Sequence, residues 1–136
     1  MIKSNKPSRA TPTRAKRNNG EGLEQKLFFD WLKLAKPMAR ALTFAIPNGG
    51  KRDELVGFIL KQQGVTAGVP DVYMAVPTDF YPGLFIEFKY GSNKLTGVQQ
   101  VFIARLREAG YRVDVCYSFE EARNVVLEYL KGSEYD

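Results

Sequence analysis

Glu87 and Lys89 stand two residues apart inside an apolar run that spans residues 84–89, LFIEFK. Because side chains alternate between the two faces of a strand, this acid and this lysine share one face of an otherwise apolar strand. Charged groups in such a place are costly unless they are paired or bound to a metal ion. Asp71 opens the preceding apolar run, so it lies beside Glu87 if the two strands are antiparallel neighbours. Two close carboxylates would form a hard-oxygen site for a divalent cation, and Lys89 could activate a water or offset phosphate charge.

A structural alternative exists for this pair, namely a salt bridge between Glu87 and Lys89 on a half-exposed strand. The triplet E-x-K alone does not distinguish the two interpretations. The dipeptide Pro70-Asp71 on the preceding strand, in a short chain of alternating helices and strands, favours the cation site.

The elements that position these residues are predicted from apolar periodicity and from turn residues. The predicted helices cover residues 20–36, 52–63, 97–109 and 118–130, and the predicted strands cover residues 42–46, 71–76, 84–90 and 112–117. The order α-β-α-β-β-α-β-α predicts an α/β fold, with a mixed β-sheet flanked by helices. Pro37 is expected to stop the first helix, and Ser118 with Glu121 has the spacing of a capping box.

Composition indicates one domain with an uneven charge. The chain has 136 residues and a net charge of +5. Residues 1–19 contain six basic residues and no acid, whereas the other 14 Lys and Arg face 15 acids and leave residues 20–136 at −1. We predict a disordered basic tail over 1–19 and a folded domain over 20–132. The tail could attract DNA phosphates, or it could serve only as a solvated segment that aids solubility.

The residue types present restrict the possible cofactors. The chain has no histidine and a single cysteine, Cys116, which excludes an internal disulfide and the usual zinc sites. We expect Cys116 to be a buried apolar residue, and any metal to be held by oxygen atoms, as magnesium, manganese and calcium are. No apolar run is long enough to span a membrane and no signal peptide is evident, so we expect a cytoplasmic or nucleoid-associated protein of bacterial or phage origin.

Pro70-Asp71 followed by Glu87-Phe88-Lys89 resembles the PD-(D/E)xK nuclease signature. Residues 21–130 more closely resemble the VRR-NUC domain of that superfamily. The similar segments are IPNGG at 46–50, GVTAGVPD at 64–71 and GLFIEFK at 83–89, continued in register by Leu95-Thr96, Gln99 and Gly110-Tyr111. The Val-Arg-Arg tripeptide that gives the domain its name does not occur here, which leaves the subfamily and the substrate open.

This resemblance implies a restriction-endonuclease-like core that uses magnesium or manganese. It implies that Asp71, Glu87 and the backbone carbonyl of Phe88 hold the ion, and that Lys89 is the catalytic lysine. Gln99 matches a recurrent glutamine of the family and would therefore act in the site. The spacing of Gln99 from Thr96 fits a capping box equally well.

An acid from the first helix usually completes sites of this family, and two residues could supply it. Glu24 shares a helix face with Leu27, Phe28 and Trp31, at the edge of the expected buried stripe. Glu21 lies in the first turn, where an acid is favourable because of the helix dipole. We favour Glu24 over Glu21 as a possible metal ligand.

Four further residues have two interpretations each. Asn48 could act in the site or simply form the turn of Pro-Asn-Gly-Gly. Lys51 and Arg52 could contact phosphate or end a solvated loop. Tyr73 lies two residues after Asp71 on the same strand face, where it could stack near the site or fill space beside it.

The activity implied by the resemblance is that of a metal-dependent endonuclease that hydrolyses DNA phosphodiester bonds. Relatives act on branched DNA such as flaps or Holliday junctions, so a structure-selective enzyme is expected. The alternatives are a non-catalytic DNA-binding module that retains the nuclease fold and a protein-interaction subunit. Because a domain this small covers few base pairs, a homodimer that acts on two strands is a further expectation.

Overall fold

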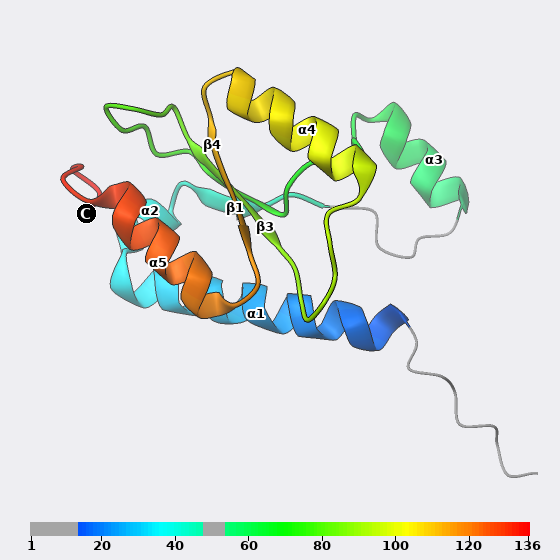
Figure 1. Ribbon diagram of the computed structural model, residues 1–136, viewed down its shortest axis with the longest axis horizontal. Helices are drawn as coiled ribbons and strands as arrows, with labels where there is room; N and C mark the ends of the chain where they lie inside the picture. Colours follow the sequence, from blue (N-terminus) through cyan, green and yellow to red (C-terminus); the bar gives the residue numbers. More distant parts are fainter. Residues whose placement is uncertain (1–13, 48–53) are drawn as a thin grey trace, which may run out of the picture.

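The computed structural model describes residues 14–47 and 54–136, with side chains described from Gly20 onward. The helices are α1 (Arg14–Ala35), α2 (Pro37–Arg40), α3 (Glu54–Gln62), α4 (Gly97–Glu108) and α5 (Phe119–Leu130). The strands are β1 (Thr43–Ala45), β2 (Val72–Met74), β3 (Leu84–Phe88) and β4 (Arg112–Cys116). Figure 1 shows these elements in the predicted order, with the short helix α2 added. The predicted α/β class, with helices around a mixed sheet, is confirmed.

The four strands form one sheet in the order β1-β2-β3-β4. The first two pairs are antiparallel, and β3 pairs with β4 in parallel. In the β2–β3 ladder Val72 lies opposite Ile86. This register, continued by one residue, puts Asp71 opposite Glu87, as expected for antiparallel neighbours.

The core lies on the face of the sheet that carries Val72, Met74 and Ile86, and these side chains are fully or almost fully buried. Helix α1 packs against this face through Phe28, whose ring lies 5.7 Å from that of Phe88. Helices α1 and α5 lie side by side in Figure 1. Neighbouring positions on a strand point to opposite faces, so the same strand that anchors the core presents Glu87 on its other face.

Most element boundaries agree with the sequence prediction to within two residues, but the region of the first helix differs in two respects. Helix α1 begins at Arg14 rather than Gly20, so the end of the predicted tail is helical. Pro37 does not only stop α1, because it also starts α2, where the fixed φ of proline suits the first turn of a helix. Residues 1–13 lie outside the described residues, and the disorder of the tail and the domain limits stay predictions. None of the helices in the described part of the chain is both long enough and apolar enough to cross a membrane.

Candidate active site

Asp71 directly precedes β2 and is held by contacts with backbone amides on both sides. The Phe88 amide donates a hydrogen bond of 2.8 Å to Asp71 Oδ2. The Ile46 amide donates a hydrogen bond of 2.7 Å to the Asp71 carbonyl oxygen. These bonds tie the residue to β3 and to the chain that follows β1, so its carboxylate is fixed beside that of Glu87.

Glu87 is 3% exposed, and its two carboxylate oxygens differ in their surroundings. Oε1 accepts a hydrogen bond of 3.0 Å from Gln99 Nε2 and lies 3.7 Å from Lys89 Nζ. Oε2 is buried and receives no hydrogen bond from any residue that the structure describes. A buried carboxylate oxygen without a donor is costly, and such atoms occur where a proton, an ion or a ligand completes the site.

The surroundings of Glu87 raise the pKa of its carboxyl group to about 8. The main cause is loss of solvation on burial, followed by repulsion from the Asp71 carboxylate. The Lys89 ammonium opposes the rise, and the carboxylate of Glu21 adds to it. In the absence of a cation Glu87 therefore holds a proton at neutral pH, which it can share with Asp71.

Lys89 is 7% exposed, so the structure does not support a salt bridge on a half-exposed strand. The backbone amide of Lys89 donates to the Cys116 carbonyl oxygen, which continues the β3–β4 ladder past the end of β3. The ammonium group is thus held in a buried position, at a distance from Glu87 that is long for a close ion pair.

Gln99 forms the capping box that its spacing from Thr96 allowed, and its side chain also contacts Glu87. Its backbone amide donates to Thr96 Oγ1 at 3.2 Å, and its side-chain oxygen accepts from the Thr96 amide at 3.0 Å. This capping box at the start of α4 uses the oxygen of the Gln99 amide. The nitrogen of the same amide is left pointing at Glu87, so the cap fixes the donor that contacts the site.

Glu24, the helix acid that we favoured, is placed elsewhere. Its carboxylate accepts a hydrogen bond of 2.6 Å from the amide of Phe119, the first residue of α5. Trp31, seven residues later on the same face of α1, packs on the Phe119 ring with centroids 6.2 Å apart. This face of α1 therefore meets α5, and Glu24 caps a helix rather than facing Asp71 and Glu87.

Glu21, the acid that we did not favour, contributes to the electrostatics of the site, because its carboxylate helps to raise the pKa of Glu87. It lies seven residues before Phe28, on the face of α1 that packs against β3. Asn93 Nδ2 donates a hydrogen bond of 3.3 Å to Glu21 Oε1 and holds the carboxylate toward the loop after β3. Gly20 permits this close approach, because a Cβ there would lie 2.7 Å from the ring of Tyr90. The seven-residue spacing to Phe28 is the sequence signal that places Glu21 on this face of α1.

Comparisons with known proteins place the chain in a family. The model of the VRR-NUC domain matches residues 17–120. The chain belongs to the VRR-NUC domain family. This family is one of the PD-(D/E)xK nucleases, so the resemblance seen in the sequence is confirmed. The chain is also similar to a solved structure described as a "VRR_NUC domain protein", with 26% identity, a TM-score of 0.72, and coverage of 85% of this chain and 92% of that one. A search of curated proteins found no significant match.

The oxygen atoms of this VRR-NUC domain that could bind a metal suit a hard divalent cation. Asp71 and Glu87 supply carboxylate oxygens, and the uncompensated Oε2 of Glu87 is the kind of atom that a cation would satisfy. Among the described residues, no three His, Cys, Asp or Glu side chains are grouped to hold a metal. This set suits magnesium, which is usually bound through one or two carboxylates and completed by waters and substrate phosphate.

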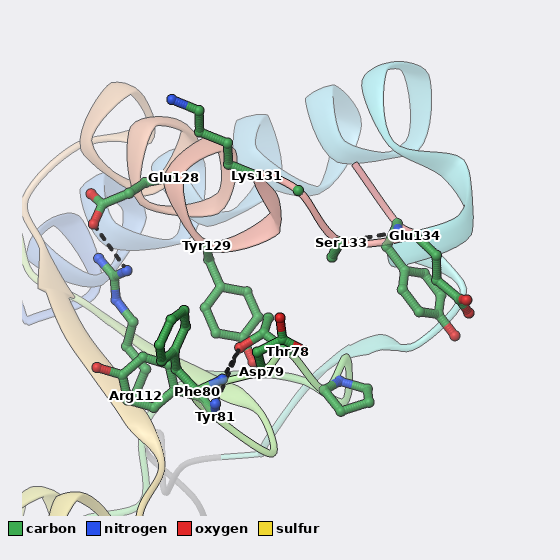
Figure 2. A pocket seen from close by; sticks show the side chains of 13 residues that line it. Thr78, Asp79, Phe80, Tyr81, Arg112, Glu128, Tyr129, Lys131, Ser133 and Glu134 are labelled. Carbon is green, nitrogen blue, oxygen red and sulfur yellow. Dashed lines mark hydrogen bonds and ion pairs between the residues drawn. The ribbon is translucent and has the colours of Figure 1, made fainter.

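One cavity of the VRR-NUC domain lies away from these carboxylates. Its volume is about 810 Å³, and it is lined by the loop 77–81, by Arg112 and by residues around the end of α5. Figure 2 shows Arg112 turned toward Glu128, with which it forms an ion pair of 3.2 Å. Asp71, Glu87 and Lys89 do not line this cavity, so its size does not indicate the site of chemistry.

The remaining candidate residues have other roles or lie outside the described residues. Tyr73 packs against Phe85, with ring centroids 4.4 Å apart and ring planes tilted by 31°, and it also contacts the rings of Phe44 and Tyr111. Burial of the Cys116 side chain, which we predicted, is confirmed, and it raises the pKa of the thiol to about 12. Asn48, Lys51 and Arg52 are outside the described residues.

Proposed function

We propose that this VRR-NUC domain is a divalent-metal-dependent endonuclease that hydrolyses DNA phosphodiester bonds with magnesium or manganese. One observation carries the proposal above the others. Glu87 is buried beside a second carboxylate, with one oxygen that no described donor satisfies. A module that only binds DNA has no need of this arrangement, because its energetic cost contributes nothing to phosphate contacts.

Asp71 and Glu87 would hold the cation, together with the backbone carbonyl of Phe88. When bound, such an ion lowers the pKa of a water and offsets charge on the reacting phosphate. The protein prepares for this by fixing both carboxylates before any ion arrives. Asp71 is held by the Phe88 amide, and Glu87 is held by Gln99.

Lys89 would be the catalytic lysine of this site. Its ammonium is buried next to Glu87 rather than solvated, so it has few competing water contacts. From this position it would donate a hydrogen bond to the attacking water or to a phosphate oxygen. Gln99 acts as a positioning residue, because it contacts Glu87 and takes its own orientation from Thr96.

Glu21 would be the helix acid of the site, in place of Glu24. Its carboxylate influences the ionisation of Glu87 and is oriented by Asn93. At this position Glu21 would not coordinate the cation directly, as Asp71 and Glu87 would. It would attract the cation electrostatically or contact it through an intervening water. Glu24 is engaged with α5 and would contribute to stability only.

We propose branched DNA, such as flaps and four-way junctions, as the preferred substrate, and a pair of subunits as the active form. Membership of the family supports DNA processing as the general role. The basic residues at the N-terminal end would add sequence-independent attraction to phosphates. Their removal should then weaken DNA binding and reduce its dependence on salt.

The test is cleavage of a panel of linear, nicked, flap and four-way DNA substrates, with magnesium and with EDTA. We expect cleavage with magnesium or manganese and none with EDTA, and the Glu87→Gln variant should bind the same DNA without cutting it. Binding without cleavage by the wild-type protein under every metal condition would instead show a non-catalytic DNA-binding module. Absence of DNA binding at low salt would favour a protein-interaction subunit.

A further inference from the structure

Tyr117 is an exposed aromatic residue that directly follows β4, at the edge of the candidate active site. Its side chain is 40% exposed. The parallel β3–β4 ladder, continued by one residue past Cys116, puts Tyr117 beside Lys89. Cys116 belongs to the core, so Tyr117, the next residue, presents its ring on the opposite face of the sheet, which also carries Glu87. The buried charges of the site therefore border solvent at this ring.

The ring of Tyr117 has no partner within the described part of the protein. No residue that the structure describes makes a hydrogen bond, an ion pair or a ring contact with this side chain. Tyr81 is similarly exposed, at 37%, but it packs on Tyr129 with ring centroids 6.2 Å apart. Single exposed aromatic residues are common on protein surfaces, so the position of Tyr117 beside Lys89 is what makes it significant.

The backbone that carries this ring is fixed at the junction between β4 and α5. The Tyr117 amide donates a hydrogen bond of 2.6 Å to Glu121 Oε2, and Ser118, the next residue, caps α5. Figure 1 shows this junction at the end of the sheet where β3 also ends. The ring is thus carried to the site by ordered backbone, and little more than its side-chain rotation is lost when a ligand binds.

The charges around Tyr117 favour a nucleobase over a phosphate as the ligand of its ring. The Glu121 carboxylate lies at the Tyr117 amide, and Glu120 is the neighbouring residue, so a phosphate placed here would be repelled. A nucleobase is uncharged and stacks on an aromatic ring whatever its sequence. Strand spacing and rise put Tyr117 roughly 8 Å from Glu87 along the sheet. A base next to the phosphate that reacts at Glu87 would therefore be within reach of the ring.

Stacking of this kind depends on the shape of the DNA. Within a continuous duplex both faces of every base are covered by its neighbours, and exposing one costs free energy. At a flap, a nick or a branch point a base face is already exposed. We propose that Tyr117 is a specificity-determining residue, which stacks on the unpaired or terminal base beside the scissile phosphate and so favours branched over continuous DNA. This inference rests on the proposed nuclease function and adds the means by which branched substrates are selected.

The first test is the affinity of the full-length protein for a fluorescein-labelled flap and for a continuous duplex, measured by anisotropy in EDTA, where no strand is cut. We expect Tyr117→Ala to weaken flap binding by about tenfold or more and duplex binding by less than about twofold. Tyr117→Phe should bind the flap as the wild type does, because stacking needs the ring and not the hydroxyl. Tyr81→Ala is the matched control, since Tyr81 is similarly exposed in the loop before β3, at the other end of the sheet.

The second test needs no variant and so does not depend on a variant that folds. The flap is made with 5-iodouracil as the unpaired base beside the branch, and the complex with wild-type protein is irradiated. This base forms covalent links with aromatic side chains that stack on it, and mass spectrometry of the digested complex locates the link. We expect the link at Tyr117.

Four results would overturn the proposal. These are unchanged flap binding by Tyr117→Ala, equal losses of flap and duplex binding in that variant, a loss in Tyr117→Phe as large as in Tyr117→Ala, and a crosslink at a different residue. In each case the protein would still bind DNA, so the proposed nuclease function would stand without this role for Tyr117. A wild-type protein that binds none of these DNAs would overturn both.

Discussion

Two neighbouring strands carry an acid and a base with the same spacing, and they use them in opposite ways. Strand β3 continues into Glu87-Phe88-Lys89, and β4 contains Arg112-Val113-Asp114. Arg112 Nε lies 2.8 Å from Asp114 Oδ2, and a second acid, Glu128, completes the pairing. Lys89 Nζ lies 3.7 Å from Glu87, and both residues are buried.

The difference shows what an alternating acid and base on a strand can and cannot indicate. The β4 pair, Arg112 and Asp114, is partly exposed, and its charges are balanced by close ion pairs, so it needs no ligand. The β3 pair, Glu87 and Lys89, leaves a buried oxygen of Glu87 without a hydrogen-bond donor. A second carboxylate, that of Asp71, lies beside this pair. The spacing of an acid and a base on a strand is therefore uninformative alone. The chemical site is identified by a buried polar atom that has no hydrogen-bond partner.

The cleavage rate should show the largest difference between substitutions in the β3 pair and those in the β4 pair. We expect Asp71→Asn, Glu87→Gln and Lys89→Ala each to lower the single-turnover rate by about 1,000-fold or more, roughly 4 kcal/mol in transition-state stabilisation. Arg112→Ala, the matched change in the β4 pair, should retain a rate close to wild type. Comparable losses in both pairs would remove the distinction between them.

The next effect concerns the pH dependence of stability. The pKa of Glu87 in the folded protein, about 8, lies above that of an unfolded glutamate. The folded state therefore binds the extra proton, and this contribution is complete below about pH 4 and lost as the pH rises through 8. In EDTA, the free energy of unfolding should fall by several kcal/mol across this window, at about 1.4 kcal/mol per pKa unit.

Denaturant unfolding of the wild type and of Glu87→Gln at a series of pH values measures this effect. The variant cannot titrate at this position and should show a flatter profile, and magnesium should flatten the wild-type profile by stabilising the ionised carboxylate. Parallel profiles for the two proteins in EDTA would mean that Glu87 is not perturbed.

Substitutions of the two acids of α1, Glu21 and Glu24, should have different effects, as substitutions in the β3 and β4 pairs do. Glu21→Gln should raise the magnesium concentration for half-maximal cleavage by about tenfold, as is common for groups that support a metal site. Glu24→Ala should lower the free energy of unfolding by about 1 kcal/mol through loss of the cap on Phe119, with cleavage unchanged. The opposite assignment of effects would restore Glu24 as the helix acid.

The smallest effect should come from breaking the β4 pair. Asp114→Asn is expected to cost less than about 1 kcal/mol, because Arg112 keeps Glu128 as a partner and both groups reach solvent. Thermal unfolding measures this change. A loss of several kcal/mol would show that the β4 pair is as critical to the fold as the β3 pair is to the site.

The sequence predicted the order of the main elements and the meeting of Asp71 with Glu87, because strand alternation and turn residues are local signals. It did not distinguish Glu21 from Glu24. Both lie near the apolar stripe of α1, and the choice depends on which side of this helix meets β3 and which meets α5. Phe28 on Phe88 and Trp31 on Phe119 decide this, and both are contacts between residues distant in the chain.

Similarly, periodicity did not predict the start of α1 at Arg14, since the polar residues before Gly20 carry no apolar pattern. The orientation of Gln99 was equally beyond local rules. Its capping role was visible from the spacing to Thr96, whereas its contact with Glu87 depends on how α4 lies across the sheet.

Calorimetric titration of magnesium or manganese into the metal-free protein tests most directly whether Glu87 and Asp71 together bind a divalent cation. We expect one ion per chain for the wild type, the same affinity for Asp114→Asn, and loss of most of the binding for Glu87→Gln, which keeps the shape of the side chain and removes its charge. Equal affinity of the wild type and Glu87→Gln would contradict the account.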